Sequence, residues 1–222
     1  MKPDLSTIKA LVFDAYGTLL DVKSLDERLS HHYGDKAEAI NSLWRQKQLQ
    51  YTWLRSLMDQ YQPFSQVTRQ ALEFACEEND AELRSDVLSD LLEHYEILRC
   101  FPEVPNLLEE LSQYFRCAIL SNADLPMLTK ACDHNEIMTS LEAVLSADAV
   151  HINKPAPAVY KLATDHFQCD KDEIAFISSN TWDVAGAKSF GLRCIWLKRT
   201  NTMDKLNFAP DYLIKGLHEL IP

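Results

Sequence analysis

The chain lacks any apolar run that approaches the ~20 residues needed to cross a bilayer. Its first residues, Met1-Lys2-Pro3-Asp4, also lack the apolar core of a secretory signal. The six cysteines are scattered with no C-x-x-C pair, which argues against disulfides and zinc ligands and favours reduced thiols. No cysteine sits at a clear turn after a strand, so a catalytic cysteine is not expected. We therefore expect a cytoplasmic protein that does not span a membrane.

Positive charge is also scarce, because 22 Lys and Arg residues face 33 Asp and Glu residues, for a net charge of -11. Nucleic acids and anionic membranes do not attract a body of net negative charge, so neither is expected as a partner. A small anionic substrate is compatible with this charge if cationic side chains gather at the site. With 222 residues, 46% of them hydrophobic, the chain is long enough for a sizeable globular core.

A run of strand-forming residues does occur near the amino terminus, from Ile8 to Phe13. It ends at Asp14, and Gly17 follows three positions later, where the chain must turn. This pattern puts Asp14 at the carboxyl end of a buried strand, the edge at which open parallel α/β sheets bind ligands. A single Asp in this place is more often only a turn residue, so the later segments decide its role.

A helical block follows, because strand signals vanish after Asp21 and apolar residues recur at helical spacing up to about Leu98. In its first part these residues are Leu43, Trp44, Leu49, Trp53, Leu54 and Leu57. The serines Ser24, Ser42 and Ser65 are candidate helix starts. We predict a helical cap subdomain over residues 22–98, inserted after the first strand and covering the strand ends as a lid. The α/β core comprises residues 1–21 and 99–222.

Strands alternate with helices in the rest of the chain, with strands predicted at 116–120, 143–145, 174–177, 192–197 and 212–214. This order predicts a Rossmann-like parallel sheet flanked by helices and joined by right-handed crossovers. Polar residues follow successive strands and would converge at one edge. They are Asp14 and Thr18, Ser121 and Asn122, Lys154, and Ser178, Asn180 and Asp183.

Such a cluster has a definite chemistry. A carboxylate beside a lysine and several hydroxyl and amide donors is held in its charged form, and an oriented carboxylate is a competent nucleophile. Taken singly, Lys154 is as readily a solvated loop residue, and Ser121 and Ser178 are as readily turn residues. Their shared location directly after buried strands favours a functional site.

Four ordered segments and one lid segment resemble motifs of the haloacid dehalogenase superfamily, and within it the L-2-haloacid dehalogenases. The segments span residues 13–19, 120–122, 154–155 and 178–188, and the lid segment spans residues 44–55. The resemblance runs from about Ile8 to about Leu197. One such motif alone is weak evidence, whereas their agreement in order is specific.

Two positions indicate the branch of the superfamily. Its magnesium-dependent phosphatases carry a second Asp where this chain has Tyr16, and an acidic metal ligand where it has Ser178. A hydroxyl is a poor substitute for a carboxylate as a magnesium ligand. Phosphoryl transfer would lose charge neutralisation and leaving-group protonation without the metal and the acid. The resemblance therefore implies a dehalogenase with no metal and no cofactor.

The reaction implied by the resemblance has two displacements. Asp14 attacks the halogen-bearing carbon of an L-2-haloacid, forming an ester and releasing halide, and water then hydrolyses the ester to a D-2-hydroxy acid. Arg45 of the lid and Asn122 are implied as the halide cradle, although an arginine on a helix is ordinarily only solvated. The remaining implied catalytic residues orient Asp14 or activate the hydrolytic water, and they are Thr18, Lys154, Ser178, Asn180 and Asp183. Either Asp183 or Lys154 would take the proton from that water.

The implied substrate-binding residues are Ala15, Tyr16, Arg45, Leu49, Phe64, Ser121, Asn122, Tyr160 and Trp182. Ser121, with the backbone amides of Ala15 and Tyr16, would hold the carboxylate. The apolar residues would wall the substrate, although Phe64 is nearly as well explained as plain core. Tyr160 resembles the supporting tyrosine of the family, bonded to a catalytic carboxylate. The chain departs from the family with Ala123-Asp124 where a glycine is common, which is expected to narrow the pocket or repel the anion.

Two other functions compete with this interpretation: a phosphatase of the same superfamily and a catalytically idle protein that binds a small carboxylate. Magnesium-dependent phosphate release would favour the first, and absence of halide release would favour the second. The resemblance also implies a homodimer. The lid stripe with Trp44, Tyr51 and Trp53 is a candidate dimer surface, or else it packs within the monomer.

Overall fold

The computed structural model describes residues 2–199 and 206–222. In this part of the chain six strands form one sheet, in the order β3-β2-β1-β4-β5-β6, and every neighbouring pair is parallel. The strands are β1 (Ala10–Phe13), β2 (Arg116–Ser121), β3 (Ala143–Ser146), β4 (Ile174–Ser178), β5 (Arg193–Leu197) and β6 (Tyr212–Ile214). This parallel sheet confirms the predicted core.

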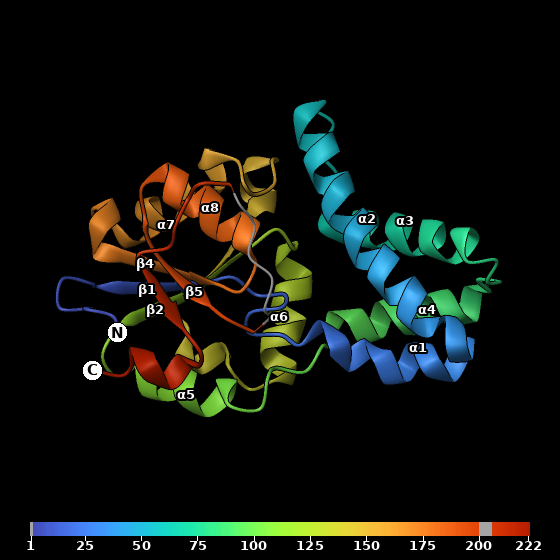
Figure 1. Ribbon diagram of the computed structural model, residues 1–222, viewed down its shortest axis with the longest axis horizontal. Coiled ribbons are helices and arrows are strands. Elements are labelled where there is room, and N and C mark those ends of the chain that lie inside the picture. The colour runs from blue at the N-terminus through green and yellow to red at the C-terminus, as the bar shows by residue number, and fades with distance from the viewer. Residues whose placement is uncertain (1, 200–205) are drawn as a thin grey trace.

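Helices cover both faces of the sheet, because alternate residues of a buried strand point to opposite sides. Leu11 and Phe13 pack on one side with α5 (Val104–Leu111) and α6 (Leu125–His134). Ala10 and Val12 pack on the other side with α7 (Pro157–Phe167) and α8 (Thr181–Phe190). Figure 1 shows α7 and α8 above the sheet and α5 below it. Short 3-10 helices occur at η3 (Met138–Ser140), η4 (Ala147–Val150), η5 (Lys171–Glu173) and η6 (Leu217–Leu220).

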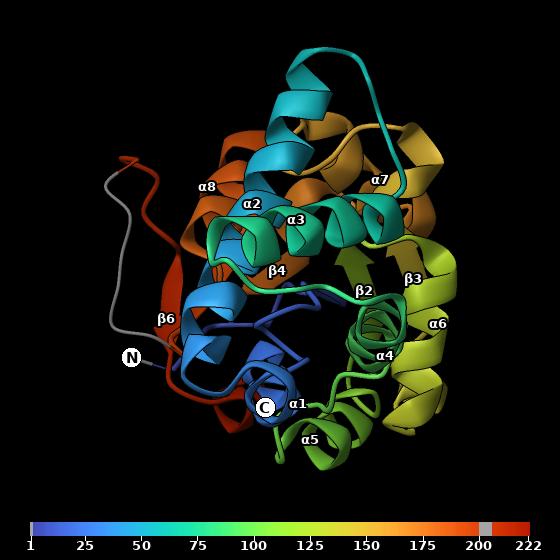
Figure 2. The ribbon, with the colours of Figure 1, turned by 90° about the vertical axis from the view of Figure 1, so that its right-hand side faces the viewer.

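A helical cap follows β1 in the sequence. Its elements are η1 (Val22–Leu25), α1 (Asp26–Tyr33), η2 (Gly34–Lys36), α2 (Ala37–Leu57), α3 (Phe64–Glu78) and α4 (Ser85–Glu96). The cap lies beside one end of the sheet, with α2 and α3 crossing in front of the strands (Figures 1 and 2). The predicted helical insertion is thus confirmed, while its boundaries at residues 22 and 98 stay a prediction. No helix of the described residues is long and apolar enough to cross a membrane.

The buried face of α2 differs from the one that its apolar residues suggest. Of those residues, Leu54 and Leu57 are exposed, Leu57 by 84%. The buried residues recur every three or four positions and are Ala37, Ile40, Trp44, Gln48 and Thr52. The polar members of this set are buried because their side chains find hydrogen-bond partners inside the protein.

The serines predicted as helix starts do not begin helices. Ser42 lies inside α2 and Ser24 lies inside η1. Ser65 is the second residue of α3, which begins at Phe64 after Pro63. The prediction for Ser65 was therefore close, and those for Ser24 and Ser42 were wrong, because the helices that contain them begin at Val22 and Ala37.

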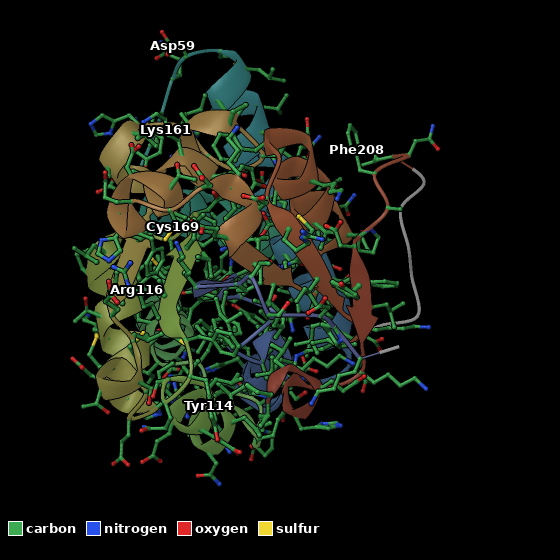
Figure 3. The ribbon with its side chains drawn as sticks, turned by 90° about the vertical axis from the view of Figure 1, so that its left-hand side faces the viewer. Asp59, Tyr114, Arg116, Lys161, Cys169 and Phe208 are labelled. Atoms are coloured by element: carbon green, nitrogen blue, oxygen red, sulfur yellow. The ribbon has the colours of Figure 1, made fainter. Side chains whose placement is uncertain are left out.

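Figure 3 shows the opposite edge of the sheet, where the strands begin and where Arg116 lies. Arg116, the first residue of β2, pairs with Glu142 at 2.6 Å, and its guanidinium lies over the ring of Phe167 at 4.7 Å. Asp59, in the turn after α2, marks the far tip of the cap in the same view. The polar residues predicted to form a site therefore lie at the other edge of the sheet, under the cap.

Candidate active site

Asp14 is fixed at the carboxyl edge of the sheet by the backbone. Its N–H donates to the carbonyl oxygen of Ile177 at 2.9 Å, so pairing of β1 with β4 continues one residue beyond the strand. The chain then turns at Gly17, whose φ of +82° favours a residue without a Cβ atom. This turn brings Thr18 back beneath the Asp14 carboxylate.

The two oxygens of Asp14 have unequal surroundings. Oδ2 accepts hydrogen bonds from Asn180 Nδ2 at 2.7 Å, Thr18 Oγ1 at 2.9 Å and Ser178 Oγ at 3.2 Å. Oδ1 accepts one, from Lys154 Nζ at 3.2 Å. The carboxylate is therefore held firmly through Oδ2, while Oδ1 keeps lone pairs for other interactions.

Lys154 lies between two carboxylates and is almost completely buried. Its Nζ is 3.2 Å from Asp14 Oδ1 and 2.8 Å from Asp183 Oδ2. Burial alone would lower its pKa, but the nearby charges of Asp14 and Asp183 outweigh burial and raise it. Its backbone N–H donates to Asn122 Oδ1 at 2.7 Å, which also fixes the orientation of the Asn122 amide. Lys154 is thus a positioned ammonium group.

Asp183, in the first turn of α8, is held from its other side. Its Oδ1 accepts a hydrogen bond from the hydroxyl of Tyr160 at 2.7 Å. Burial, with a smaller contribution from Asp14, raises the pKa of Asp183 to about 6 against the opposing charge of Lys154. A carboxyl group with such a pKa can accept and release a proton near neutral pH.

A small cavity lies between these groups and the cap. Its volume is about 20 Å³, room for little more than one water molecule. The lining residues come from both parts of the chain and are Asp14, Tyr16, Arg45, Leu49, Phe64, Ser121, Asn122, Lys154, Asn180 and Trp182. A neighbouring cleft of about 460 Å³ shares Arg45, Leu49, Asn180 and Trp182 with it. The cavity is therefore small and adjoins a wider cleft.

Arg45 reaches the cavity from α2 in the cap. Its Nη2 donates to the carbonyl oxygen of Tyr16 at 3.4 Å, and its Nη1 donates to Gln48 Oε1 at 3.0 Å. Because Tyr16 follows Asp14 by two residues, the guanidinium lies over the loop that carries Asp14. A permanent positive charge thus lies at the cavity of a strongly acidic protein.

The other sequence-predicted residues lie behind the cavity. Thr18, Ser178 and Asp183 contact the residues that line it, as described above. Tyr160 does not line the cavity, although it was predicted among the substrate-binding residues, and it contacts Asp183 instead. Ala15 is fully buried, and no acceptor for the backbone amides of Ala15 and Tyr16 is found among the described residues.

The departure at Ala123-Asp124 does not reach the cavity directly, because neither residue lines it. Ala123 is fully buried. The Asp124 carboxylate accepts hydrogen bonds from Ser65 of α3. The expected narrowing or repulsion of the anion therefore has no direct contact to support it.

Sequence reasoning gave no role at the site to three buried residues of the cap that form the hydrogen-bond network beside Arg45: Gln48, Thr68 and Tyr95. Gln48 follows Arg45 by three residues, a spacing that puts both side chains on one face of a helix. That spacing was the available signal. Thr68 and Tyr95 lie on other helices and are brought near only by the fold.

The described residues at this site do not form a metal-binding cluster, and the buried cysteines are not reactive thiolates. Among residues 2–199 and 206–222, no group of three or more His, Cys, Asp or Glu side chains is placed to hold a metal ion. Lys154 Nζ occupies the space between the two carboxylates of the site. Burial raises the pKa of Cys100, Cys117, Cys132 and Cys194 to about 12, which disfavours reactive thiolates at these positions.

The order of these elements and the polar strand ends define an α/β protein with a helical cap over a polar site. The sequence model of the family described as haloacid dehalogenase-like hydrolase matches residues 8–191, and the chain belongs to this family.

The similarity extends to individual members of the family. The chain is 40% identical to (S)-2-haloacid dehalogenase 4A of Burkholderia cepacia, over 98% of this chain and 95% of that protein. It is 38% identical to (S)-2-haloacid dehalogenase 2 of a Pseudomonas species, strain CBS-3, over 97% and 95% of the two chains. Its structure resembles L-2-haloacid dehalogenase from Xanthobacter autotrophicus with chloropropionic acid covalently bound. That match has a TM-score of 0.91 and 34% identity, and it covers 96% of each chain.

Proposed function

We propose that this protein hydrolyses L-2-haloacids to D-2-hydroxy acids through a covalent ester on Asp14, without a metal ion. The observation that carries the proposal is the asymmetry of the Asp14 carboxylate: among the described residues, Oδ2 has three donors and Oδ1 has one, Lys154. The similar enzyme from Xanthobacter autotrophicus holds chloropropionic acid in a covalent bond, which supports an ester intermediate. Lys154 between Asp14 and Asp183 supports metal independence, because it supplies the positive charge there.

In the first step, a lone pair of Asp14 Oδ1 forms a bond to C2 of the substrate, and the carbon–halogen bond breaks. Its electron pair leaves with the halide. No proton donor is needed, but the halide needs positive partners. Arg45 carries N–H groups beyond those bonded to Gln48, Tyr95 and Tyr16, and Asn122 keeps its Nδ2 donor. These two residues form the halide cradle.

The substrate carboxylate is bound by Ser121 together with the backbone amides of Ala15 and Tyr16. The apolar wall is formed by Tyr16, Leu49, Phe64 and Trp182, which line the cavity.

In the second step, water adds to Cγ of the ester, and the bond from Cγ to Oδ1 breaks. Oδ1 leaves as the hydroxyl oxygen of the product, which takes a proton from the tetrahedral intermediate, and the water oxygen becomes part of the new Asp14 carboxylate. The hydroxy acid leaves, and Asp14 regains a carboxylate. Asp183, with a pKa of about 6, accepts the proton from this water, and Lys154 positions the groups involved. The net reaction consumes one water and releases one halide and one proton.

Two further features belong to the proposal. Dimerisation through the cap would use the exposed side chains of Leu54, Leu57 and Met58 rather than Trp44, which is buried within the monomer. Size-exclusion chromatography with light scattering tests it. A cytoplasmic location is consistent with six free cysteines and is tested by cell fractionation.

The proposed function is tested by halide release from L- and D-2-chloropropionate in chelator-treated buffer, with a phosphate ester and magnesium in parallel. Chloride from the L form alone, unaffected by chelator, supports the proposal. Phosphate release that requires magnesium, with no chloride from either enantiomer, contradicts it and favours a phosphatase.

The nucleophile is tested with Asp14→Asn, which should release no halide while keeping the circular dichroism spectrum of the folded protein. Mass spectrometry of the wild-type protein quenched during turnover should place the ester on the peptide that contains Asp14. An Asp14→Asn protein that turns over, with deamidation excluded by its mass, contradicts the assignment.

A further inference from the structure

A buried amide in the cap directs the cationic side chain of the site. Gln48 is fully buried on α2 and does not line the cavity. Its Oε1 accepts hydrogen bonds from Arg45 Nη1 and from the Tyr95 hydroxyl, both at 3.0 Å. Its Nε2 donates to Thr68 Oγ1 at 2.7 Å. The amide is thus bonded to three different side chains, one of them Arg45.

The orientation of this amide follows from the single proton of the Thr68 hydroxyl. That proton goes to the carbonyl oxygen of Phe64 at 2.7 Å, so Oγ1 can only accept from Gln48. Gln48 must therefore present its NH₂ group to Thr68 and its oxygen to Arg45. Thr68 itself is held, because its carbonyl oxygen accepts from Trp44 Nε1 at 2.8 Å.

The network also connects to the loop of the nucleophile. The Tyr95 ring stacks on Tyr16, with centroids 5.3 Å apart and an interplanar angle of 14°. The backbone oxygen of Tyr16 accepts from Arg45 Nη2. The guanidinium of Arg45 is therefore held at three points, by the Gln48 oxygen and the Tyr95 hydroxyl in the cap and by the Tyr16 carbonyl in the core.

We propose that Gln48 is a positioning residue that aims the Arg45 guanidinium at the departing halide. The proposal rests on the proposed function, in which Arg45 belongs to the halide cradle. A neutral acceptor suits this role. It orients the guanidinium through a charge-assisted hydrogen bond and leaves its positive charge available to the anion, whereas a carboxylate would neutralise that charge.

The test compares kcat/KM for L-2-chloropropionate and L-2-bromopropionate. Chloride is the poorer leaving group, so its release depends more on stabilisation by Arg45. Gln48→Met keeps the length of the side chain but removes its polar atoms. It should lower kcat/KM for the chloro acid about tenfold, in line with loss of one hydrogen bond to a charged group, and lower it less for the bromo acid. Arg45→Lys should change the chloro-to-bromo ratio in the same direction.

A double-mutant cycle separates positioning from general support of the cap. If Gln48 acts through Arg45, Gln48→Met should cause little further loss in the Arg45→Lys protein. Thr52→Val is the matched control, because Thr52 is buried one turn further along α2 and its hydroxyl donates to the Leu49 carbonyl rather than to Arg45. It should lower the melting temperature while leaving the chloro-to-bromo ratio unchanged.

A second variant covers the case in which Gln48→Met does not fold. Gln48→Glu keeps an oxygen beside Arg45 but pairs with its charge, so KM for the anionic substrate should rise. The proposal is overturned if the effects of Gln48→Met and Arg45→Lys on kcat/KM are fully additive and Gln48→Met leaves the chloro-to-bromo ratio unchanged. It is also overturned if Gln48→Glu keeps wild-type kinetics. An unmoved ratio in Arg45→Lys overturns the proposed role of Arg45 itself. Absence of halide release from the wild type overturns the proposed function. Either of these two results also overturns the inference on Gln48.

Discussion

Asp124 accepts two hydrogen bonds from Ser65, one from its backbone N–H at 3.2 Å and one from its hydroxyl at 2.7 Å. Asp124 stands directly before α6 of the core, yet its side chain makes no capping bond to that helix. Its side chain instead accepts hydrogen bonds at the N-terminus of α3 in the helical cap subdomain, where a negative charge also interacts favourably with the positive end of the helix dipole. The contact ties the segment after β2 to Phe64, the first residue of α3 and part of the cavity wall.

Asp124→Ala should therefore weaken both the cap and the pocket. Loss of a helix cap costs about 1 kcal/mol, so the melting temperature should fall by a few degrees. KM for L-2-chloropropionate should rise, because Phe64 is held less firmly. Asp124→Asn keeps an acceptor and should recover most of both losses, as measured by thermal unfolding and steady-state kinetics.

Tyr61→Phe is the matched control for Asp124. It breaks another bond between cap and core, from the Tyr61 hydroxyl to Asp148 Oδ1 at 2.9 Å, but leaves the start of α3 intact. It should lower the melting temperature without changing KM. Equal effects of Tyr61→Phe and Asp124→Ala on KM would show that general loosening, and not the placement of Phe64, is responsible.

Local patterns account for what the sequence predicted correctly. The run from Ile8 to Phe13 and the acidic residue after it mark a buried strand and its end. The rule that parallel strands end at one edge then brings Asp14, Ser121 and Ser178 together. No side-chain contact needs to be known for this step, which explains why the strand-end residues could be placed from the sequence.

Contacts between distant segments account for what the sequence did not predict. Hydrophobicity cannot show that Gln48 is buried while Leu57 is exposed, because Gln48 is accommodated by partners on other helices. Asp124 likewise looks like the cap of its own helix and in fact caps α3. These contacts depend on how the helical cap packs against the core, and the periodicity of the sequence does not reveal that packing.

Lys154→Met should abolish ester formation, because it leaves the carboxylates of Asp14 and Asp183 buried without their shared cation. Removal of one partner from a buried ion pair typically costs 3–5 kcal/mol, so the melting temperature should also fall. Quenched-turnover mass spectrometry measures the ester, and calorimetry measures stability. Wild-type ester yield in Lys154→Met would contradict the proposed role, and Lys161→Met, which alters an exposed pair with Asp165, is the control.

The pKa of about 6 at Asp183 predicts a pH dependence in the second step. The pKa is raised, so the carboxylate form exists above about pH 6 and is lost as the pH falls through that value. Ester hydrolysis should slow about tenfold per pH unit well below pH 6, and the ester should accumulate at pH 5. Single-turnover measurements with mass detection test this. In Asp183→Asn the ester should persist at every pH, and a wild-type rate that stays constant down to pH 5 would rule out Asp183 as the base.

Gly186 lies in the interior of α8, where alanine would ordinarily stabilise a helix by up to about 1 kcal/mol. Here a Cβ atom would stand 2.6 Å from the Cβ of Pro155 and would also overlap the Tyr160 hydroxyl. Gly186→Ala should therefore destabilise the protein and push Tyr160 away from Asp183, slowing ester hydrolysis more than ester formation.

The Tyr160 hydroxyl can be tested as the origin of this effect with Tyr160→Phe, which removes it. Adding Gly186→Ala to the Tyr160→Phe protein should cost less stability than adding it to the wild type, because part of the overlap has gone. The contact with Pro155 remains, so the relief should be partial. Full additivity in thermal unfolding would instead assign the whole effect to Pro155 and leave the position of Tyr160 independent of Gly186.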